Sequence, residues 1–448
     1  MKRWCLRELE GWKANPNRKP LLLLGARQVG KTWLMQEFGK QHYRNVAYIR
    51  FDKDAAMRQS FEQDYDIRRL LNTIHLRTGV ALIPGETLII LDEIQECAGA
   101  LTSLKYFCEE AREHHIMAAG SLLGLEENIG TGFPVGKVDR VYMYPMSFTE
   151  FLDAVGYGQY VELLRSRDWG MISLFGSKLE ELLRYYYYVG GMPAAVAEYV
   201  RSGDMQAVRR LQNNLLADYR VDFRKHATAA ETHLITQVWD SLPEQLAQEN
   251  KRFVHAAVGE GVRAPMLRGP IRWLDDAAMV QVVPRVKKPE LPLSAYQDGA
   301  FKMFFLDVGL LAAKCKLKAS VILEQNSIFG QYKGALTEQY VQQQLRTDCG
   351  IAPFYWAAER AQAEVDFLVE TEGGIVPMEV KAERNLRAKS LQSFCKRYQY
   401  PMAVRLSMSS YEVNPIETSG KHRYTLVDMP LYAVVALPDE VEAQMSVR

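Results

Sequence analysis

Eight consecutive residues near the start of the chain have the types and spacing of a phosphate-binding loop. Residues 25–32 read GARQVGKT and fit the pattern G-x-x-x-x-G-K-[ST]. The glycines let the backbone turn without a Cβ, so that several N–H groups can point inward at phosphate oxygens. The Lys31 amine can reach the β- and γ-phosphates, and the Thr32 hydroxyl can hold Mg²⁺. We therefore expect a nucleoside triphosphate to be bound by Gly25, Ala26, Arg27, Gln28, Val29, Gly30, Lys31 and Thr32.

An acidic pair, Asp92 and Glu93, follows the apolar run LIIL at residues 88–91. A carboxylate at the carboxyl end of a buried strand, beside a phosphate loop, can bind the magnesium shell. A second carboxylate next to it can orient and polarise the attacking water as a general base. We expect Asp92 to hold Mg²⁺ and Glu93 to take the catalytic role. The alternative is a solvated acidic pair at a helix N-terminus, which is common.

Three further residues are candidates for the same site. Ser121 closely follows the apolar run at 116–119, where it could contact the γ-phosphate or the attacking water. The alternative for Ser121 is a helix N-cap. Lys137 and Arg140 lie in a loop-like stretch, and either could neutralise transition-state charge across a subunit interface. The alternative for both is a solvated loop cation, so the identity of such a residue stays open between them.

These residues can meet only if the strands that precede them end beside one another. Apolar runs at 21–24, 46–51, 87–91 and 116–119 alternate with helical patterns. Strands that are buried on both faces and alternate with helices indicate a parallel sheet in an α/β layer fold. We expect a P-loop NTPase core over residues 1–150.

The pattern changes twice after that core. Helical runs continue to about residue 280, and a short strand and a lysine-containing loop follow. Helices followed by a β-ribbon suggest a winged-helix-like module. Helical and strand patterns then alternate again, with a glycine turn between two strands. We expect three further domains: a helical lid at 151–230, a winged-helix-like module at 231–315 and an α/β domain at 316–448.

Length and composition fit a globular protein of several domains. The chain has 448 residues, of which 48% are hydrophobic and 24% charged. The net charge of +1 creates no global field towards DNA or a membrane, so any nucleic-acid contact must come from local basic patches. The six cysteines form no CxxC pair, and no apolar run reaches the roughly 18 residues of a membrane span. With no signal-peptide pattern at the start, we expect a cytoplasmic protein with no membrane partner.

Several stretches together carry a family resemblance. They are GARQVGKT (25–32), LIILDEIQE (88–96), AAGSLLG (118–124), FPVGKV (133–138), YPMSFTEF (144–151), VGGMPAAV (189–196), FKMFFLDVGLL (301–311), AEVDFLVE (363–370) and MEVKA (378–382). Over nearly its whole length the chain resembles the bacterial and archaeal AAA-type ATPases that carry a C-terminal domain of unknown function. The resemblance implies ATP binding and hydrolysis with Mg²⁺, a middle winged-helix module and a restriction-endonuclease-like C-terminal half. Many relatives have arginine where this chain has Lys137, and AAA-type relatives often form rings, so a homo-oligomer is expected by analogy.

A second constellation lies in the C-terminal part. Alternation along two strands joined by a turn places Asp366, Glu379 and Lys381 on one face. Two carboxylates and an amine suit Mg²⁺-dependent phosphodiester hydrolysis: Asp366 and Glu379 would hold the metal, and Lys381 would orient or deprotonate water. This is the D…(D/E)-x-K pattern of the restriction-endonuclease-like superfamily, and Glu338 resembles the additional acidic ligand of such folds. The alternatives are a solvent-facing hairpin with paired charges, or a site that binds nucleic acid without cutting it.

Basic residues in the middle module suggest a DNA contact. Arg263, Arg268 and Arg272 lie near helical spacing, and Lys287 and Lys288 follow in the expected wing. The alternative makes these arginines the solvated rim of a helix whose core face is Met266, Ile271, Leu274 and Met279.

The function that these features predict together is an Mg²⁺-dependent ATPase that acts on DNA and carries a nuclease-like C-terminal domain. The alternative is an ATP-dependent conformational switch whose C-terminal domain only docks a protein partner. A small-molecule phosphotransferase is disfavoured, because the chain shows no compact lid motif and because Glu93 beside Asp92 suits attack by water.

Overall fold

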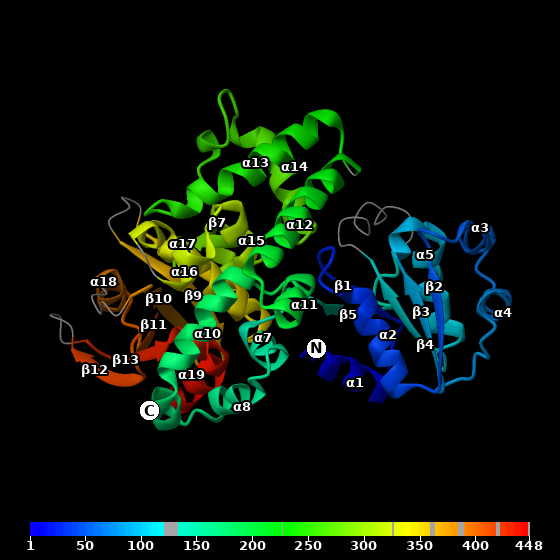
Figure 1. Cartoon of the computed structure of the whole chain (residues 1–448), viewed down its shortest axis with the longest axis horizontal. Helices are drawn as coiled ribbons and strands as arrows, with labels where there is room; N and C mark the ends of the chain where they lie inside the picture. The colour runs from blue at the N-terminus through cyan, green and yellow to red at the C-terminus, as the bar shows by residue number, and fades with distance from the viewer. Residues whose placement is uncertain are drawn as a thin grey trace. The chain divides into compact units, whose positions relative to one another are not determined.

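The computed structural model describes residues 1–120, 133–225, 227–324, 327–358, 363–383, 389–417 and 422–446. The chain divides into two compact units (Figure 1). The N-terminal unit comprises Met1–Tyr144 with Asp276–Met279, and the C-terminal unit comprises Pro145–Asp275 with Val280–Arg448.

The N-terminal unit is built on a parallel five-stranded sheet in the order β2-β3-β4-β1-β5. Its strands are β1 (Leu21–Leu24), β2 (Asn45–Arg50), β3 (Thr87–Asp92), β4 (His115–Ala119) and β5 (Asp139–Tyr142). The four strands expected from apolar runs are confirmed to within one residue at each end. β5 was not expected, because the sequence DRVY has no apolar run, and Arg140 therefore lies in a strand and not in a loop.

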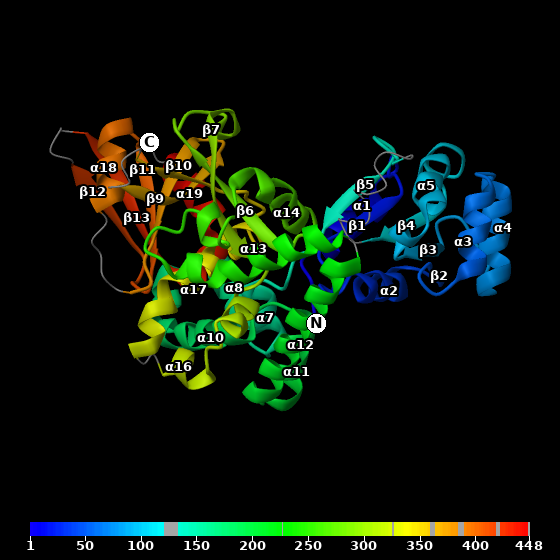
Figure 2. The same ribbon diagram turned by 90° about the horizontal axis from the view of Figure 1, so that it is seen from above.

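Helices cover both faces of this sheet, which explains why every residue of β1 and β3 is buried. On one face, α3 (Ala55–Gln63), α4 (Ile67–Thr78) and α5 (Ala98–Glu110) form a single apolar core with the alternate residues Leu22, Leu24, Ile89 and Leu91. The buried side chains of α2 (Lys31–His42) lie outside that core, and α2 is seen on the other side of the sheet (Figure 2). The short helix α1 (Leu6–Ala14) precedes the sheet.

The C-terminal unit begins with helices, as expected. They are α7 (Phe148–Ala154), α8 (Gly158–Ser166), α9 (Trp169–Leu174), α10 (Gly176–Val189), α11 (Pro193–Ser202), α12 (Met205–Lys225), α13 (Ala229–Ala247) and α14 (Ala264–Asp276). α7 begins at a capping box in which Ser147 and Glu150 bind each other's backbone N–H groups. On α14 the buried residues are Leu267, Pro270 and Leu274, so the expectation that Met266 belongs to the core face is wrong; Met266 is 48% exposed.

A mixed eight-stranded sheet forms the rest of this unit, in the order β12-β13-β11-β10-β9-β8-β6-β7. Its strands are β6 (Val280–Val286), β7 (Gln297–Phe305), β8 (Phe354–Ala357), β9 (Glu364–Thr371), β10 (Gly374–Val380), β11 (Met402–Ser407), β12 (Glu412–Glu417) and β13 (Arg423–Pro430). The accompanying helices are α15 (Val308–Lys314), α16 (Ala319–Leu323), α17 (Ser327–Thr347), α18 (Lys389–Tyr398) and α19 (Leu437–Ser446). The β6–β7 hairpin, expected as the wing of a separate module, joins this sheet through β8, and the division into four domains stays a prediction.

Two of the family-like stretches meet inside the C-terminal unit. The Gly191 N–H donates to Asp307 Oδ2 over 2.6 Å, and the Leu310 N–H donates to Asp307 Oδ1 over 3.0 Å. A Cβ at Gly190 would lie 2.1 Å from Asp307 Oδ1, so only glycine fits there. These stretches therefore hold the end of α10 against the start of α15 and have a structural role.

Three glutamines of α17 complete this packing. Gln339 accepts the Phe305 N–H and donates to the Phe305 carbonyl, whereas Gln343 accepts the Val308 N–H and Gln344 the Phe148 N–H.

Across the described ranges, no helix is both long and apolar enough to cross a membrane.

Candidate active site

The loop between β1 and α2 has the backbone of a phosphate-binding turn. Gly25, Gln28 and Gly30 all have positive φ angles, of 152°, 66° and 97°. A Cβ at Gly25 would lie 2.2 Å from the Met143 carbonyl oxygen, so a larger residue would push the loop away from the end of β5. Gly30 precedes the first turn of α2, whose unpaired N–H groups make the helix N-terminus favourable for anions.

The Lys31 ammonium is held by its own loop. Its Nζ donates to the carbonyl oxygens of Gly25 and Ala26, each over 2.8 Å. Burial lowers the pKa of Lys31 to about 8, against the opposing effect of the Glu93 and Asp92 carboxylates. Among the described residues no carboxylate forms an ion pair with Lys31. Both of its bonds go to neutral carbonyls, and a phosphate oxygen can replace them.

Strand register brings the acidic pair to this loop. Leu23 lies opposite Ala119, and Ala119 lies opposite Asp92, so β1, β4 and β3 end in one row. Thr32 Oγ1 donates to Asp92 Oδ2 over 2.7 Å, which joins the phosphate loop directly to the end of β3. The structure thus brings together the two residues, Thr32 and Asp92, that the sequence assigns to magnesium. A hydroxyl and a carboxylate oxygen are ligands that Mg²⁺ prefers, so this pair fits the ion.

Glu93 takes an unusual backbone conformation next to that pair. Its φ of 51° is left-handed, which is strained for a residue with a side chain and is often found at functional sites. The Glu93 Oε2 accepts a hydrogen bond from Gln95 Nε2 over 2.5 Å. Glu93 is only half-buried, so its carboxylate remains accessible to water.

Tyr48 and Arg3 belong to this site and were missed by sequence reasoning. The Tyr48 hydroxyl donates to Asp92 Oδ2 over 2.8 Å, and burial together with this bond raises the pKa of Tyr48. Arg3, near the start of the chain, donates to the Val29 carbonyl over 2.9 Å and to the Tyr144 carbonyl over 2.6 Å. Tyr48 could have been suspected from its place near the carboxyl end of β2, whereas no local signal indicates Arg3.

The remaining candidates of the N-terminal unit are not joined to this site by any described contact. Ser121 lies outside the described residues. Lys137 forms an ion pair with Glu109, with 2.8 Å between Nζ and Oε1, and Arg140 lies 5.0 Å from the centre of the Phe133 ring. A role for either residue across a subunit interface stays a prediction.

The C-terminal constellation is organised around a lysine that the sequence did not single out. The Nζ of Lys302, on β7, lies 2.5 Å from Glu364 Oε1, 3.4 Å from Glu338 Oε2 and 3.7 Å from Asp366 Oδ1. Lys302 is fully buried, and it lies over the Tyr355 ring at 5.0 Å. Burial lowers the pKa of Lys302, but the three carboxylates outweigh burial and raise that pKa above its ordinary value. Lys302 therefore remains a cation.

The predicted ligands of this second site are in contact with protein cations. Lys251 and Lys302 both bind Glu338, and Lys381 binds Glu379, with 2.5 Å between Nζ and Oε1. Asp366 Oδ2 accepts the Val380 N–H over 2.8 Å, which ties β9 to β10. Burial raises the pKa of Asp366 and of Glu379, with added repulsion from neighbouring carboxylates.

Protein cations already compensate part of the negative charge in this arrangement. In the part of the chain that the structure describes, no group of three or more His, Cys, Asp or Glu side chains has the arrangement of a metal site. Lys302 sits where Glu338, Glu364 and Asp366 converge and already balances part of their charge. That Glu338, Asp366 and Glu379 bind metal stays a prediction.

The five basic residues that the sequence singles out in the middle region are all exposed. Arg268 and Arg272 are separated by one turn of α14, Arg263 precedes that helix, and Lys287 and Lys288 follow β6. Such a distribution suits contact with a polyanion but is equally that of a solvated rim.

Comparisons with known proteins divide the chain into three matched regions. Residues 17–152 match the model of the AAA domain family, residues 180–321 a domain of unknown function (DUF8612), and residues 333–432 another domain of unknown function (DUF4143). No curated protein matches the chain.

Two solved structures have some similarity to the chain. One is the Walker-type ATPase PABY2304 of Pyrococcus abyssi, with 16% identity, 69% of this chain and 94% of that chain covered, and a TM-score of 0.44. The other is Cdc6p from Pyrobaculum aerophilum, with 11% identity, 71% and 93% covered, and a TM-score of 0.25.

Proposed function

We propose that this chain, whose residues 17–152 form an AAA-type P-loop ATPase domain, hydrolyses Mg²⁺-bound ATP through Lys31, Thr32, Asp92 and Glu93. The observation that carries the proposal is the 2.7 Å hydrogen bond between Thr32 and Asp92, beside a loop in which Lys31 donates to two backbone carbonyls. The phosphate-binding loop, the proposed metal ligands and the half-buried Glu93 carboxylate thus lie at the carboxyl ends of strands of the same sheet.

Each residue has a separate task in this proposal. Backbone N–H groups of residues 25–32 and the N-terminus of α2 bind the phosphates. Lys31 exchanges its two carbonyl acceptors for β- and γ-phosphate oxygens, which it can do without breaking an ion pair. Thr32 and Asp92 hold Mg²⁺, which when bound polarises the phosphate oxygens and neutralises developing charge.

Glu93 acts on the attacking water. Its left-handed backbone turns the side chain at the point where β3 ends, and Gln95 fixes one carboxylate oxygen. The other oxygen is left to accept a hydrogen bond from water. It takes the proton of that water as the water oxygen bonds to the γ-phosphorus and the bond from the γ-phosphorus to the oxygen of the leaving ADP breaks.

DNA is the proposed target of the ATP-driven cycle. The exposed cations Arg263, Arg268, Lys287 and Lys288 support this part: Arg268 lies on α14, Arg263 directly precedes that helix, and Lys287 and Lys288 follow β6. The D…ExK pattern on β9 and β10 supports a restriction-endonuclease-like ancestry for the C-terminal sheet. The buried Lys302 favours a second candidate for that sheet: it docks DNA or a protein partner and does not cut.

The test is phosphate release by the full-length protein, with and without duplex and single-stranded DNA, together with a plasmid-cleavage assay. Wild type is compared with Lys31→Ala and Asp366→Ala. We expect Lys31→Ala to reduce turnover by about 100- to 1000-fold, the loss typical when one transition-state donor is removed. Turnover that Lys31→Ala leaves unchanged would refute the ATPase mechanism.

The effect of DNA on ATP turnover, together with DNA cleavage, distinguishes the proposals for the C-terminal sheet. If DNA raises ATP turnover and no Mg²⁺-dependent cleavage occurs, the protein acts on DNA without cutting it. DNA cleavage that Asp366→Ala abolishes would support a nuclease function of the C-terminal sheet. If DNA does not change ATP turnover and is not cleaved, the C-terminal sheet docks a protein partner.

A further inference from the structure

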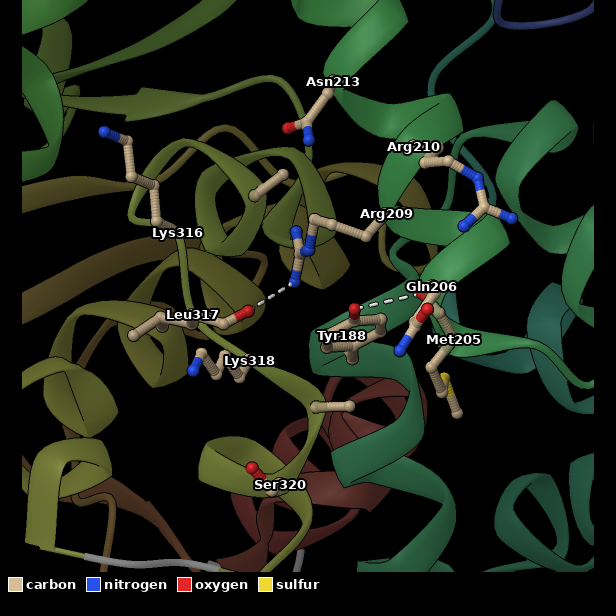
Figure 3. Close-up of a pocket in the computed structure, with 12 residues that line it drawn as sticks. Tyr188, Met205, Gln206, Arg209, Arg210, Asn213, Lys316, Leu317, Lys318 and Ser320 are labelled. Carbon is tan, nitrogen blue, oxygen red and sulfur yellow. Dashed lines mark hydrogen bonds between the residues drawn. The ribbon is translucent and has the colours of Figure 1, made fainter.

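A basic pocket of about 710 Å³ lies in the C-terminal unit (Figure 3). It is formed by the start of α12, the end of α10 and the connection between α15 and α16. Its lining includes four cations, Arg209, Arg210, Lys316 and Lys318, and no acidic residue. A pocket of this size can enclose a small molecule.

Arg209 lies in the middle of this pocket and is fixed in position. Its guanidinium lies 4.1 Å from the centre of the Tyr188 ring, and its Nη2 donates to the Leu317 carbonyl over 3.0 Å. A longer contact of 3.4 Å joins Nη1 to the Gly309 carbonyl, and Nε has no hydrogen-bond partner among the described residues. Arg209 is half-buried and burial lowers its pKa, yet no described carboxylate pairs with it, so this positive charge has no counter-charge among the described residues.

The other cations surround Arg209 on two sides. Figure 3 shows Lys316 and Arg210 on opposite sides of it, with Lys318 below Leu317. Within the described ranges neither lysine forms an ion pair, whereas Arg210 contacts the exposed Asp204 with 3.5 Å between Nη2 and Oδ2. The pocket therefore has a marked excess of positive charge.

The backbone of Lys316 is a further, independent sign. Its φ of 54° is left-handed, at a helix end where glycine or asparagine is the usual residue. The strain that a lysine brings to this position is explained if its ammonium is needed at the pocket.

We propose that this pocket binds a small anion that carries two or more phosphate groups. Arginine forks and lysine amines are the groups that recognise phosphate, and Arg209 is pre-organised by its carbonyl and aromatic contacts. Met205, Leu317 and Ala319 add an apolar wall that suits the non-phosphate part of a nucleotide-like ligand. The same phosphate chemistry occurs in a nucleic-acid backbone, but a pocket of this volume suits a compact anion.

Calorimetric titration of the full-length protein with inorganic tripolyphosphate tests the proposal. The Lys31→Ala background removes the phosphate-loop lysine, so that the remaining binding reports on the second pocket. We expect binding to persist in Lys31→Ala and to weaken by about tenfold or more when Lys316→Ser and Lys318→Ser are added. Arg209→Met should abolish it, and the exposed lysine pair keeps the test valid if that variant fails to fold.

The matched control removes two exposed lysines elsewhere in the same unit, Lys389→Ser and Lys396→Ser, and should leave tripolyphosphate binding unchanged. Absence of binding in Lys31→Ala, or an equal loss in the control pair, overturns the proposal. A single-stranded oligonucleotide is titrated in parallel. If it binds through Lys316 and Lys318 and tripolyphosphate does not, the ligand is a nucleic acid and the small-anion proposal is wrong.

Discussion

In the N-terminal unit the Lys31 ammonium donates to two carbonyl oxygens of its own loop, whereas in the C-terminal unit the Lys302 ammonium contacts three carboxylates. In the first case Asp92 accepts hydrogen bonds from the neutral hydroxyls of Thr32 and Tyr48. In the second case the carboxylates are already partly neutralised. The same residue types therefore make, in one unit, the open site at which we propose that Mg²⁺ and phosphate bind and, in the other, a closed internal ion cluster.

The largest expected effect concerns the open site. Glu93→Gln keeps the shape of the side chain and removes its basicity, so ATP turnover should fall by about 100- to 10,000-fold with nucleotide binding largely retained. Phosphate release and binding of a fluorescent ATP analogue measure the two quantities. Glu96→Gln, an exposed change in the same short turn, is the matched control and should have no comparable effect. Equal activities of the two variants would remove Glu93 from the mechanism.

The next effect concerns the closed cluster. Lys302→Met leaves buried carboxylates without their cation, which should lower the free energy of unfolding of the C-terminal unit by about 3–5 kcal/mol. Lys381→Met removes a lysine that is 34% exposed and has one partner, so its cost should be about 1 kcal/mol or less. Urea unfolding, with hydrogen exchange of peptides from β9 and β10, compares them. Similar losses would show that Lys302 is not the centre of the cluster.

The effect of metal ions on stability tests whether Lys302 keeps metal out of the closed cluster. Wild-type protein should gain no stability in the C-terminal unit from Mg²⁺ or Mn²⁺, because Lys302 occupies the position between the carboxylates. Lys302→Met should gain about 1.4 kcal/mol when the metal is present at ten times its dissociation constant. The measurement is the unfolding midpoint of β9 and β10 peptides with metal and with a chelator. A wild-type response as large as that of the variant would mean that the cluster opens to metal on its own.

The smallest effect is a pH dependence of the open site. The pKa of Lys31 in the folded, nucleotide-free protein is about 8, below its ordinary value of 10.5, because of burial. ATP binding requires the charged amine, so affinity should be constant below pH 7 and should fall above pH 8 by up to about tenfold per pH unit. In Lys31→Arg the cation persists, so this slope should disappear. Fluorescence titrations with ATP between pH 6 and pH 10 measure the affinity of both proteins. If the affinity of Lys31→Arg falls with pH as steeply as that of the wild type, a group other than Lys31 causes the pH dependence.

The parts of the proposed open site could be singled out in the sequence because they are short and local. The loop at residues 25–32 and the pair Asp92–Glu93 each follow a buried apolar strand, and parallel strands must end at one edge. Register then fixes the approach of Thr32 to Asp92. Tyr48 and Arg3 escaped prediction because their partners lie 44 and 141 residues away in the chain.

The closed cluster and its surroundings depend on the burial of polar side chains, which the pattern of apolar and polar residues in the sequence does not predict. Lys302 stands in a strand among aromatic residues, and a single lysine there is usually assigned to solvent. Gln339, Gln343 and Gln344 likewise read as the polar face of α17, yet all three are buried and satisfy backbone groups of other elements. Polar residues that serve as internal hydrogen-bond partners cannot be told from surface residues until their acceptors are known.

Arg3 has a practical consequence for anyone who shortens the protein. The AAA match begins at residue 17, and a truncated domain that starts there keeps every residue of the nucleotide loop. It loses the guanidinium that ties the middle of that loop, at Val29, to the end of the central sheet, at Tyr144. Such a fragment would keep the complete sequence motif but lose the contacts that hold the loop in place. We expect its activity to be lower than that of the full-length protein.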